Sequence, residues 1–223
     1  MRDIKTVLER MKGMTPMLMF MTVYLLAFSL LEKRRAVHYT EIHMWLDERI
    51  PFMEIFIIPY FLWFAFIALS VLYLYWNDRR NYDRAATLLY IGMTVFLIVS
   101  YVFPNIQYLR PHYIPRDNIF TDLVRYLYRT DTSTNVFPSI HVYNTLCCMA
   151  GMYRCRHTFA KKTWVRAGVT LLGVSIILST LFLKQHSTAD VIGAFAMFIP
   201  LHVLVYDYDM VIASRRKRAV LQR

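Results

Sequence analysis

The stretch of sequence that decides the fold spans residues 51–76 and reads PFMEIFIIPYFLWFAFIALSVLYLYW. Its only charged residue is Glu54, near the start. A run of this length is typical of a helix that crosses a bilayer. Such a helix needs about 20 mostly apolar residues, and its backbone polar groups must pair within the segment. This run therefore predicts an all-α, polytopic membrane protein.

Five further apolar runs surround this stretch, and the whole chain is 57% hydrophobic but only 18% charged. Soluble domains carry about 25% charged residues, so the composition agrees with helices in lipid. The run that starts at Pro138 is marginally short for a span, and Pro59 and Pro200 predict kinks in their helices. We predict one membrane-embedded domain, residues 1–223, with six transmembrane helices. Their expected ranges are 15–31, 51–76, 85–104, 138–153, 163–183 and 190–213.

The basic residues orient these spans. With six crossings, 17 of the 26 Lys and Arg residues fall on one side of the membrane and nine on the other. Because basic loops tend to stay in the cytoplasm, both termini are predicted to be cytoplasmic. We interpret the run Arg215–Arg218 as a lipid-facing stop rather than a nucleic-acid patch. The expected location is the cell membrane, and no nucleic-acid partner is predicted.

Two segments outside the spans are informative. Residues 36–50 mix apolar and charged side chains, which predicts an interfacial helix on the outer surface. Residues 105–137 form the longest loop, and a long polar loop in a compact membrane protein is usually functional.

The candidate catalytic residues lie at the outer ends of the predicted spans. Ionisable residues in or next to a span cost free energy, so their presence there indicates a function. His141 lies at the start of the fourth run and His186 at the end of the fifth. One helix of about 22 residues crosses the bilayer once, and the fifth span returns the chain. Both histidines are therefore expected at one level. No Asp/Glu cluster suggests a metal, and the three cysteines, Cys147, Cys148 and Cys155, are expected to pack as small apolar residues.

The spacing of His186 and Asp190 is i to i+4, which places both side chains on one face if that stretch is helical. The carboxylate then accepts the imidazole N–H and leaves the other nitrogen free to attack. Pro138 suits the first position of the fourth helix, whose outward N–H groups form a phosphate cradle. Arg110 is a candidate for a bidentate clamp on the same phosphate.

These residues resemble signature motifs of the type-2 phosphatidic acid phosphatase superfamily. Residues 138–141, Pro-Ser-Ile-His, look like its second motif. Ser179, His186 and Asp190 fall at the offsets of the third motif, which reads Ser-Arg, five residues, His, three residues, Asp. The stretch 182–187 is also similar to branches of the superfamily from Gram-positive bacteria.

Arg110-Pro111 looks like the end of the first motif, Lys, six residues, Arg-Pro, so the motif-bearing core covers residues 103–190. Two positions depart from the family pattern. Phe103 stands where the first motif has lysine, and Thr180 where the third has arginine, and both family residues hold phosphate oxygens. Other cations are candidates to substitute for them: Lys184, Arg116, Arg125 and Arg129.

The resemblance implies metal-independent, covalent phosphoryl transfer without a cofactor. His186 would form a phosphohistidine, with Asp190 orienting it, and His141 would serve as general acid and then as general base. Substrate phosphate binding is assigned to three residues: Arg110, Ser139 and Lys184.

Three functions are compatible with these residues. The first is a lipid phosphatase that hydrolyses a lipid phosphate or pyrophosphate at the outer face. The second is a phosphotransferase that moves a phospho-headgroup to ceramide or diacylglycerol, as in the similar sphingomyelin and inositol phosphorylceramide synthases, which also depart from the full motifs. The third is a non-enzymatic lipid binder, disfavoured because both histidines and the aspartate are present. The expected partners are a lipid substrate and the bilayer, while the sequence leaves the oligomeric state open.

Overall fold

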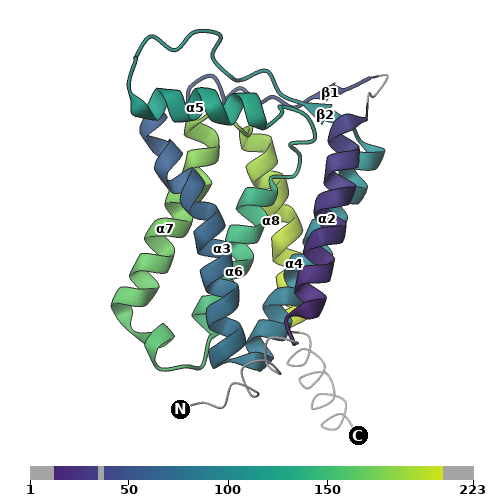
Figure 1. The fold of residues 1–223 in the computed structure, drawn as a ribbon, viewed down its shortest axis with the longest axis vertical. Coiled ribbons are helices and arrows are strands. Elements are labelled where there is room, and N and C mark those ends of the chain that lie inside the picture. The colour runs from purple at the N-terminus through teal and green to yellow at the C-terminus, as the bar shows by residue number, and fades with distance from the viewer. Residues whose placement is uncertain (1–12, 35–37, 208–223) are drawn as a thin grey trace, which may run out of the picture.

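The computed structural model describes residues 13–34 and 38–207, and it is a helical bundle whose long helices run side by side (Figure 1). The run Arg215–Arg218, used above in the orientation, lies outside these residues. The helices are α2 (Thr15–Lys33), α3 (Ile57–Asn77), α4 (Arg79–Val102), α5 (Ile119–Thr130), α6 (Ile140–Arg154), α7 (Thr163–Phe182) and α8 (Thr188–His202). Short turns of helix are η1 (Glu54–Phe56), η2 (Phe159–Lys161) and the π-helical η3 (Val203–Asp207).

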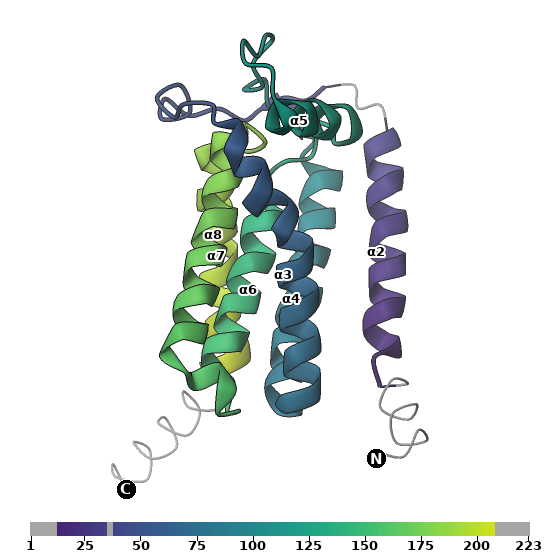
Figure 2. The same ribbon diagram turned by 60° about the vertical axis from the view of Figure 1, so that its left-hand side comes forward.

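Five helical segments are long and apolar enough to cross a membrane: 15–33, 54–77, 79–102, 163–182 and 188–207. The remaining helix that runs along the bundle, α6, has 15 residues. At 1.5 Å per residue it is about 22 Å long, which is shorter than a typical membrane span. It packs against α3, α4, α7 and α8 and lies among them in Figure 2. The chain therefore has an all-helical membrane architecture, with α6 enclosed by its neighbours.

The enclosure of α6 depends on close approach between helices. The Tyr143 side chain is fully buried, and its hydroxyl donates to the Leu88 carbonyl on α4 at 2.8 Å. A Cβ added at Gly92 would lie 2.0 Å from the Tyr143 ring. Cys147, Cys148 and Cys155 are buried in the same hydrophobic cluster as Tyr143, as expected of packing residues. Small residues at these positions let the helix backbones approach, as is usual where helices pack in lipid.

The two prolines occupy different positions in their helices. Pro59 lies in the first turn of α3, directly after the 3-10 turn η1, and the kink expected there stays a prediction. Pro200 lies inside α8, and the helix continues as the π-helical η3 three residues later. This irregularity agrees with the expectation for Pro200.

One end of the bundle carries a layer of irregular chain. The helix expected within residues 36–50 is wrong for the part described, because residues 38–50 form turns and the short strand β1 (Thr40–Glu41). This strand pairs in parallel with β2 (Asn105–Ile106). Met44 donates its backbone N–H to Asp47 at 2.8 Å, and this local bond favours a turn over a helix.

The segment 105–137 is not a loop throughout, because α5 lies across the same end of the bundle (Figure 1). Asn118 and Thr121 begin this helix with a capping box, and Val124 and Leu127 bury its inner face. The i, i+3 spacing of these apolar residues is the helical signal in the sequence. Because α5 closes this end of the bundle, it places the loop 131–139 against the helix ends.

Candidate active site

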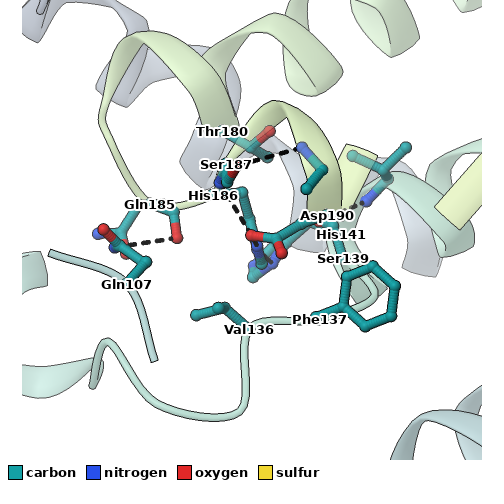
Figure 3. A network of polar contacts seen from close by, with 12 residues as sticks. Gln107, Val136, Phe137, Ser139, His141, Thr180, Gln185, His186, Ser187 and Asp190 are labelled. Carbon is teal, nitrogen blue, oxygen red and sulfur yellow. Dashed lines mark hydrogen bonds and ion pairs between the residues drawn. The ribbon is translucent and has the colours of Figure 1, made fainter. Parts of the chain in front are cut away.

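Two imidazoles and a carboxylate meet beneath this layer, at the ends of α6, α7 and α8 (Figure 3). His186 Nδ1 lies 3.2 Å from Asp190 Oδ2, and His186 Nε2 lies 3.4 Å from His141 Nδ1. His186 is 7% exposed and Asp190 is completely buried. A neutral His186 that donates from Nδ1 to Asp190 keeps the lone pair on Nε2 and directs it toward His141.

The pairing of His186 with Asp190 does not arise from a shared helix face, as the i to i+4 spacing suggested. α8 begins only at Thr188, with Ser187 as its N-cap, so His186 lies in the preceding turn. Asp190 is the third helical residue and accepts the Ser187 N–H at 2.8 Å in a capping box. The same oxygen faces His186, so one carboxylate begins the helix and orients the imidazole.

Backbone hydrogen bonds fix the turn that carries His186. The N–H groups of Gln185 and His186 both donate to the Thr180 carbonyl at 3.0 Å. Lys184 adopts a positive φ of 52°, a conformation that ends helices. Thr180 occupies the position of the family's third-motif arginine, and its buried hydroxyl donates to the Ile177 carbonyl within α7.

His141 is positioned by the start of α6. Ser139, and not Pro138, adjoins the helix as its N-cap and accepts the Val142 N–H at 3.4 Å. Pro138 precedes the cap, so its predicted place inside the first turn is wrong. The Ser139 N–H donates to the Asp190 carbonyl at 3.1 Å, which ties the second-motif segment directly to α8.

Two aromatic residues of α3 lie against the His141 ring. Tyr60 and Trp63 lie with ring centroids 4.9 and 4.4 Å from the imidazole. The Trp63 indole N–H donates to the His141 carbonyl at 3.1 Å, and the Tyr60 hydroxyl donates to Asp131 at 3.3 Å. The motif search missed both residues, because aromatic residues near helix ends in membrane proteins usually indicate an interface belt.

Arg110 connects the loop to the His186 turn. Its guanidinium donates to the carbonyls of Asp131 and Thr132 at 2.9 and 2.8 Å, and to Gln185 Oε1 at 2.7 Å. It also lies 4.8 Å from the Tyr128 ring centroid. Two buried donors, Arg110 Nε and Gln185 Nε2, have no hydrogen-bond partner within the described residues.

Lys184 points elsewhere. Its ammonium donates to the carbonyls of Asp47 and Ile50, each at 2.5 Å, and burial lowers the pKa of Lys184 below its usual value. These contacts hold the segment 42–50 onto the turn before α8. Phe103, at the first-motif lysine position, ends α4 and packs its ring against Phe137.

Asp47 is a buried supporting residue that the sequence did not single out. Its carboxylate accepts from the Ser187 hydroxyl at 2.5 Å, and from the Thr188 N–H and hydroxyl at 2.7 Å each. Burial alone would raise the pKa of Asp47, but these hydrogen bonds outweigh it, so the pKa lies below its ordinary value. Asp47 lies 140 positions before Ser187, so no local pattern could reveal this contact.

A second long-range connection holds the segment before Pro138. Asn105 Oδ1 accepts the backbone N–H groups of Val136 and Phe137 at 2.8 and 2.9 Å. Glu32, at the end of α2, accepts from Asn135 at 2.8 Å and from Thr132. Both contacts fix the loop that leads into His141.

Among the residues that the structure describes, no three His, Cys, Asp or Glu side chains are grouped as a metal site requires.

Comparison with known proteins gives one finding. The family model described as the PAP2 superfamily matches residues 26–204, which include α3 to α8 and every motif residue described above. Neither the curated proteins nor the solved structures include a significant match to the chain.

Proposed function

Since the chain belongs to the PAP2 superfamily, we propose that it is a membrane phosphatase that removes phosphate from a lipid phosphate or pyrophosphate through a phosphohistidine. One observation carries the proposal. His186 has Asp190 at 3.2 Å on one nitrogen and His141 at 3.4 Å from the other. This arrangement joins an oriented nucleophile to a proton donor.

In the first step, the His186 Nε2 lone pair attacks phosphorus and the bond to the lipid oxygen breaks. His141, protonated, gives its proton to that oxygen, and the product alcohol leaves. Asp190 accepts the Nδ1–H bond and stabilises the positive charge that develops on the imidazole of His186. In the second step His141 takes a proton from water. The resulting hydroxide attacks phosphorus, and the P–N bond breaks to return the electron pair to Nε2.

The distance between the two imidazoles sets a condition on this mechanism. The facing nitrogens lie at 3.4 Å, so a phosphoryl group that enters between them must separate the rings. Asp190 is fully buried and the His186 backbone is tied to Thr180. We therefore assign the movement to His141. Within the described residues, the aromatic rings that contact its imidazole are those of His186, Tyr60 and Trp63.

We assign phosphate binding to the predicted residues Arg110, Ser139 and Lys184, and add Gln185. Arg110 Nε and Gln185 Nε2 are buried donors that have no hydrogen-bond partner within the described residues. Each buried donor without a partner lowers the stability of the fold by about 1–3 kcal/mol. A phosphate oxygen would satisfy them. Lys184 would have to release the Asp47 and Ile50 carbonyls to take part.

We further propose that α6 is a sixth crossing and that both termini are cytoplasmic, which would put the histidines at the extracytoplasmic face of the cell membrane. The support is the 17 to nine distribution of basic residues. A single cysteine at the exposed residue Tyr108, in a variant without Cys147, Cys148 and Cys155, should react with a membrane-impermeant maleimide in intact cells. Labelling only after lysis would place the histidine end on the cytoplasmic side instead.

A phosphotransferase is the second candidate. The observation that favours it is the loss of the motif lysine and arginine at Phe103 and Thr180, which the related lipid synthases also tolerate. In that reaction an alcohol of ceramide or diacylglycerol replaces water in the second step.

The test uses purified protein with phosphatidic acid, undecaprenyl pyrophosphate, or phospholipid plus ceramide or diacylglycerol, in the presence of EDTA. Released phosphate and new phospholipid are measured together.

His186→Asn should reduce turnover by at least about 10³-fold, since it removes the nucleophile. The matched control is His157→Asn, at the other end of the bundle, where His157 contacts Tyr73. Phosphate release supports the phosphatase, and new lipid with little phosphate supports the transferase. Equal activity in His186→Asn would overturn the mechanism.

A further inference from the structure

A second polar site lies at the end of the bundle opposite the histidines, where α3 turns into α4 and α6 leads toward α7 (Figures 1 and 2). It is a pocket of about 210 Å³. Four guanidinium groups line it, two from the start of α4 and two from the end of α6 and its following residues: Arg80, Arg84, Arg154 and Arg156.

The pocket is positively charged. Among the described residues, its acidic neighbours are Asp78, which lines it, and Asp207, which pairs with Arg154 at 3.0 Å. The Asp78 carboxylate is occupied by two backbone donors, the N–H groups of Asn81 at 3.2 Å and Arg156 at 2.8 Å. Even with Arg84 left out of the balance, the two described carboxylates face three guanidiniums, those of Arg80, Arg154 and Arg156. Positive charge is therefore in excess among these groups, which favours an anion.

A buried hydroxyl points to a missing ligand independently of the charge. Tyr206 lines the pocket and is 3% exposed, yet its hydroxyl has no hydrogen-bond partner within the described residues. Arg154 lies over the Tyr206 ring at 5.0 Å. A buried hydroxyl normally has a partner, and an anion oxygen in the pocket would accept its proton.

The depth of the pocket indicates the class of anion. α3 ends at Asn77, α4 begins at Arg79 and α6 ends at Arg154, so the pocket is level with the ends of membrane helices. Lipid phosphates lie at this level of a bilayer, and arginine forks match phosphate geometry. We propose that this pocket binds the phosphate group of an anionic phosphate ester, separately from the catalytic site.

The experiment counts lipids bound to the intact protein by native mass spectrometry during titration with phosphatidylglycerol, with phosphatidylcholine as the zwitterionic comparison. The pocket variant is Arg80→Gln/Arg156→Gln, since both side chains are exposed. It should lose one bound phosphatidylglycerol, with affinity at least about tenfold weaker, because each arginine near an anionic lipid contributes about 1 kcal/mol, or about fivefold.

The matched control is Lys161→Gln/Lys162→Gln, which removes the same charge from exposed positions at the same end of the bundle but outside the pocket. It should retain the lipid. Tyr206→Phe removes only the hydroxyl and should weaken binding by about fivefold without lowering Tm, since that hydroxyl has no described partner to lose.

Two further arms identify the source of the phosphate. Inorganic phosphate or glycerol phosphate that displaces the lipid at millimolar concentration assigns the site to a soluble ester, and failure to displace it assigns the site to a lipid headgroup. Either result supports the phosphate site. Equal loss of lipid in the pocket and lysine variants, or equal retention in both, would overturn it. These outcomes do not depend on turnover at His186.

Discussion

The two ends of the helical bundle are built by different means. At the histidine end, buried hydrogen bonds connect residues far apart in sequence, such as Asp47 with Thr188 and Asn105 with Val136. At the opposite end distant residues are also joined, such as Arg156 with Asp78 at 2.8 Å, but exposed side chains form ion pairs there, such as Arg79 with Asp83 at 3.0 Å. The first end therefore buries the side chains that support its site, such as Asp47 and Asn105, while most of the arginines at the second end are exposed.

This difference has a chemical reason. A nucleophile, a proton donor and a phosphate must be aligned closely, which requires locked side chains and supporting hydrogen bonds. A site that only binds an anion needs charge of one sign within reach, and arginine side chains supply it. The comparison predicts that substitutions that remove a buried hydrogen-bonding group at the histidine end cost more in both stability and activity than substitutions of exposed charges at the opposite end.

Asp47→Ala should have the largest effect on stability. It removes the acceptor for Ser187, Thr188 and Met44, and buried donors without a partner cost about 1–3 kcal/mol each. We expect a loss of about 3 kcal/mol in the free energy of unfolding and at least tenfold in turnover, measured by thermal unfolding and lipid assay. Glu48→Ala, whose side chain is 77% exposed, is the control and should change little. Equal effects would contradict a supporting role for Asp47.

Arg110→Lys tests the loop connection at the same end. Lysine keeps the charge but cannot donate simultaneously to Asp131, Thr132 and Gln185. We expect kcat/KM to fall by about 10²-fold, measured with the best substrate of the lipid panel. Arg49→Lys, at an exposed position of the same end of the bundle, should retain activity. A drop in Tm with unchanged kcat/KM would restrict Arg110 to anchoring the loop.

Asp131→Asn should stabilise the protein slightly. Burial raises the pKa of Asp131 above its usual value, although Arg110 opposes the shift. The contribution of a carboxyl with a raised pKa is fully present below its unfolded value of about 3.9 and is lost as pH rises through the folded pKa. The amide should therefore raise Tm by about 2 °C at pH 7.5, with the gain disappearing below about pH 4. A lower Tm at pH 7.5 would show that the charged carboxylate is favourable.

Arg79→Gln, at the opposite end, should have the smallest effect. Its ion pair with Asp83 joins side chains that are 54% and 58% exposed, and such pairs contribute about 0–1 kcal/mol. Its contact with the Tyr75 ring at 4.7 Å adds a similarly small amount. Thermal unfolding should shift by about 2 °C or less. A loss like that of Asp47→Ala would remove the contrast between the two ends.

The helices were well predicted where apolar runs are long and uninterrupted, as in residues 51–76, which became η1 and α3. Prediction failed in the segments around them. Residues 38–50 form turns because Asp47 bonds to Met44 and to α8. α5 was predicted as loop because its polar residues conceal a one-sided apolar stripe, Val124 and Leu127.

The sequence alone determined the membrane class and the family, and it predicted the three residues to which we assign the chemistry, since apolar runs and fixed motif spacings are local patterns. Only the tertiary structure decided how those residues meet. His186 reaches Asp190 through an N-cap turn and not along a helix face, because Asp47 and Thr180 hold that turn from outside α8. The tertiary structure also brings the arginines of α4 and of the end of α6 together in one pocket. Contacts between distant segments depend on packing in three dimensions, which no local spacing encodes.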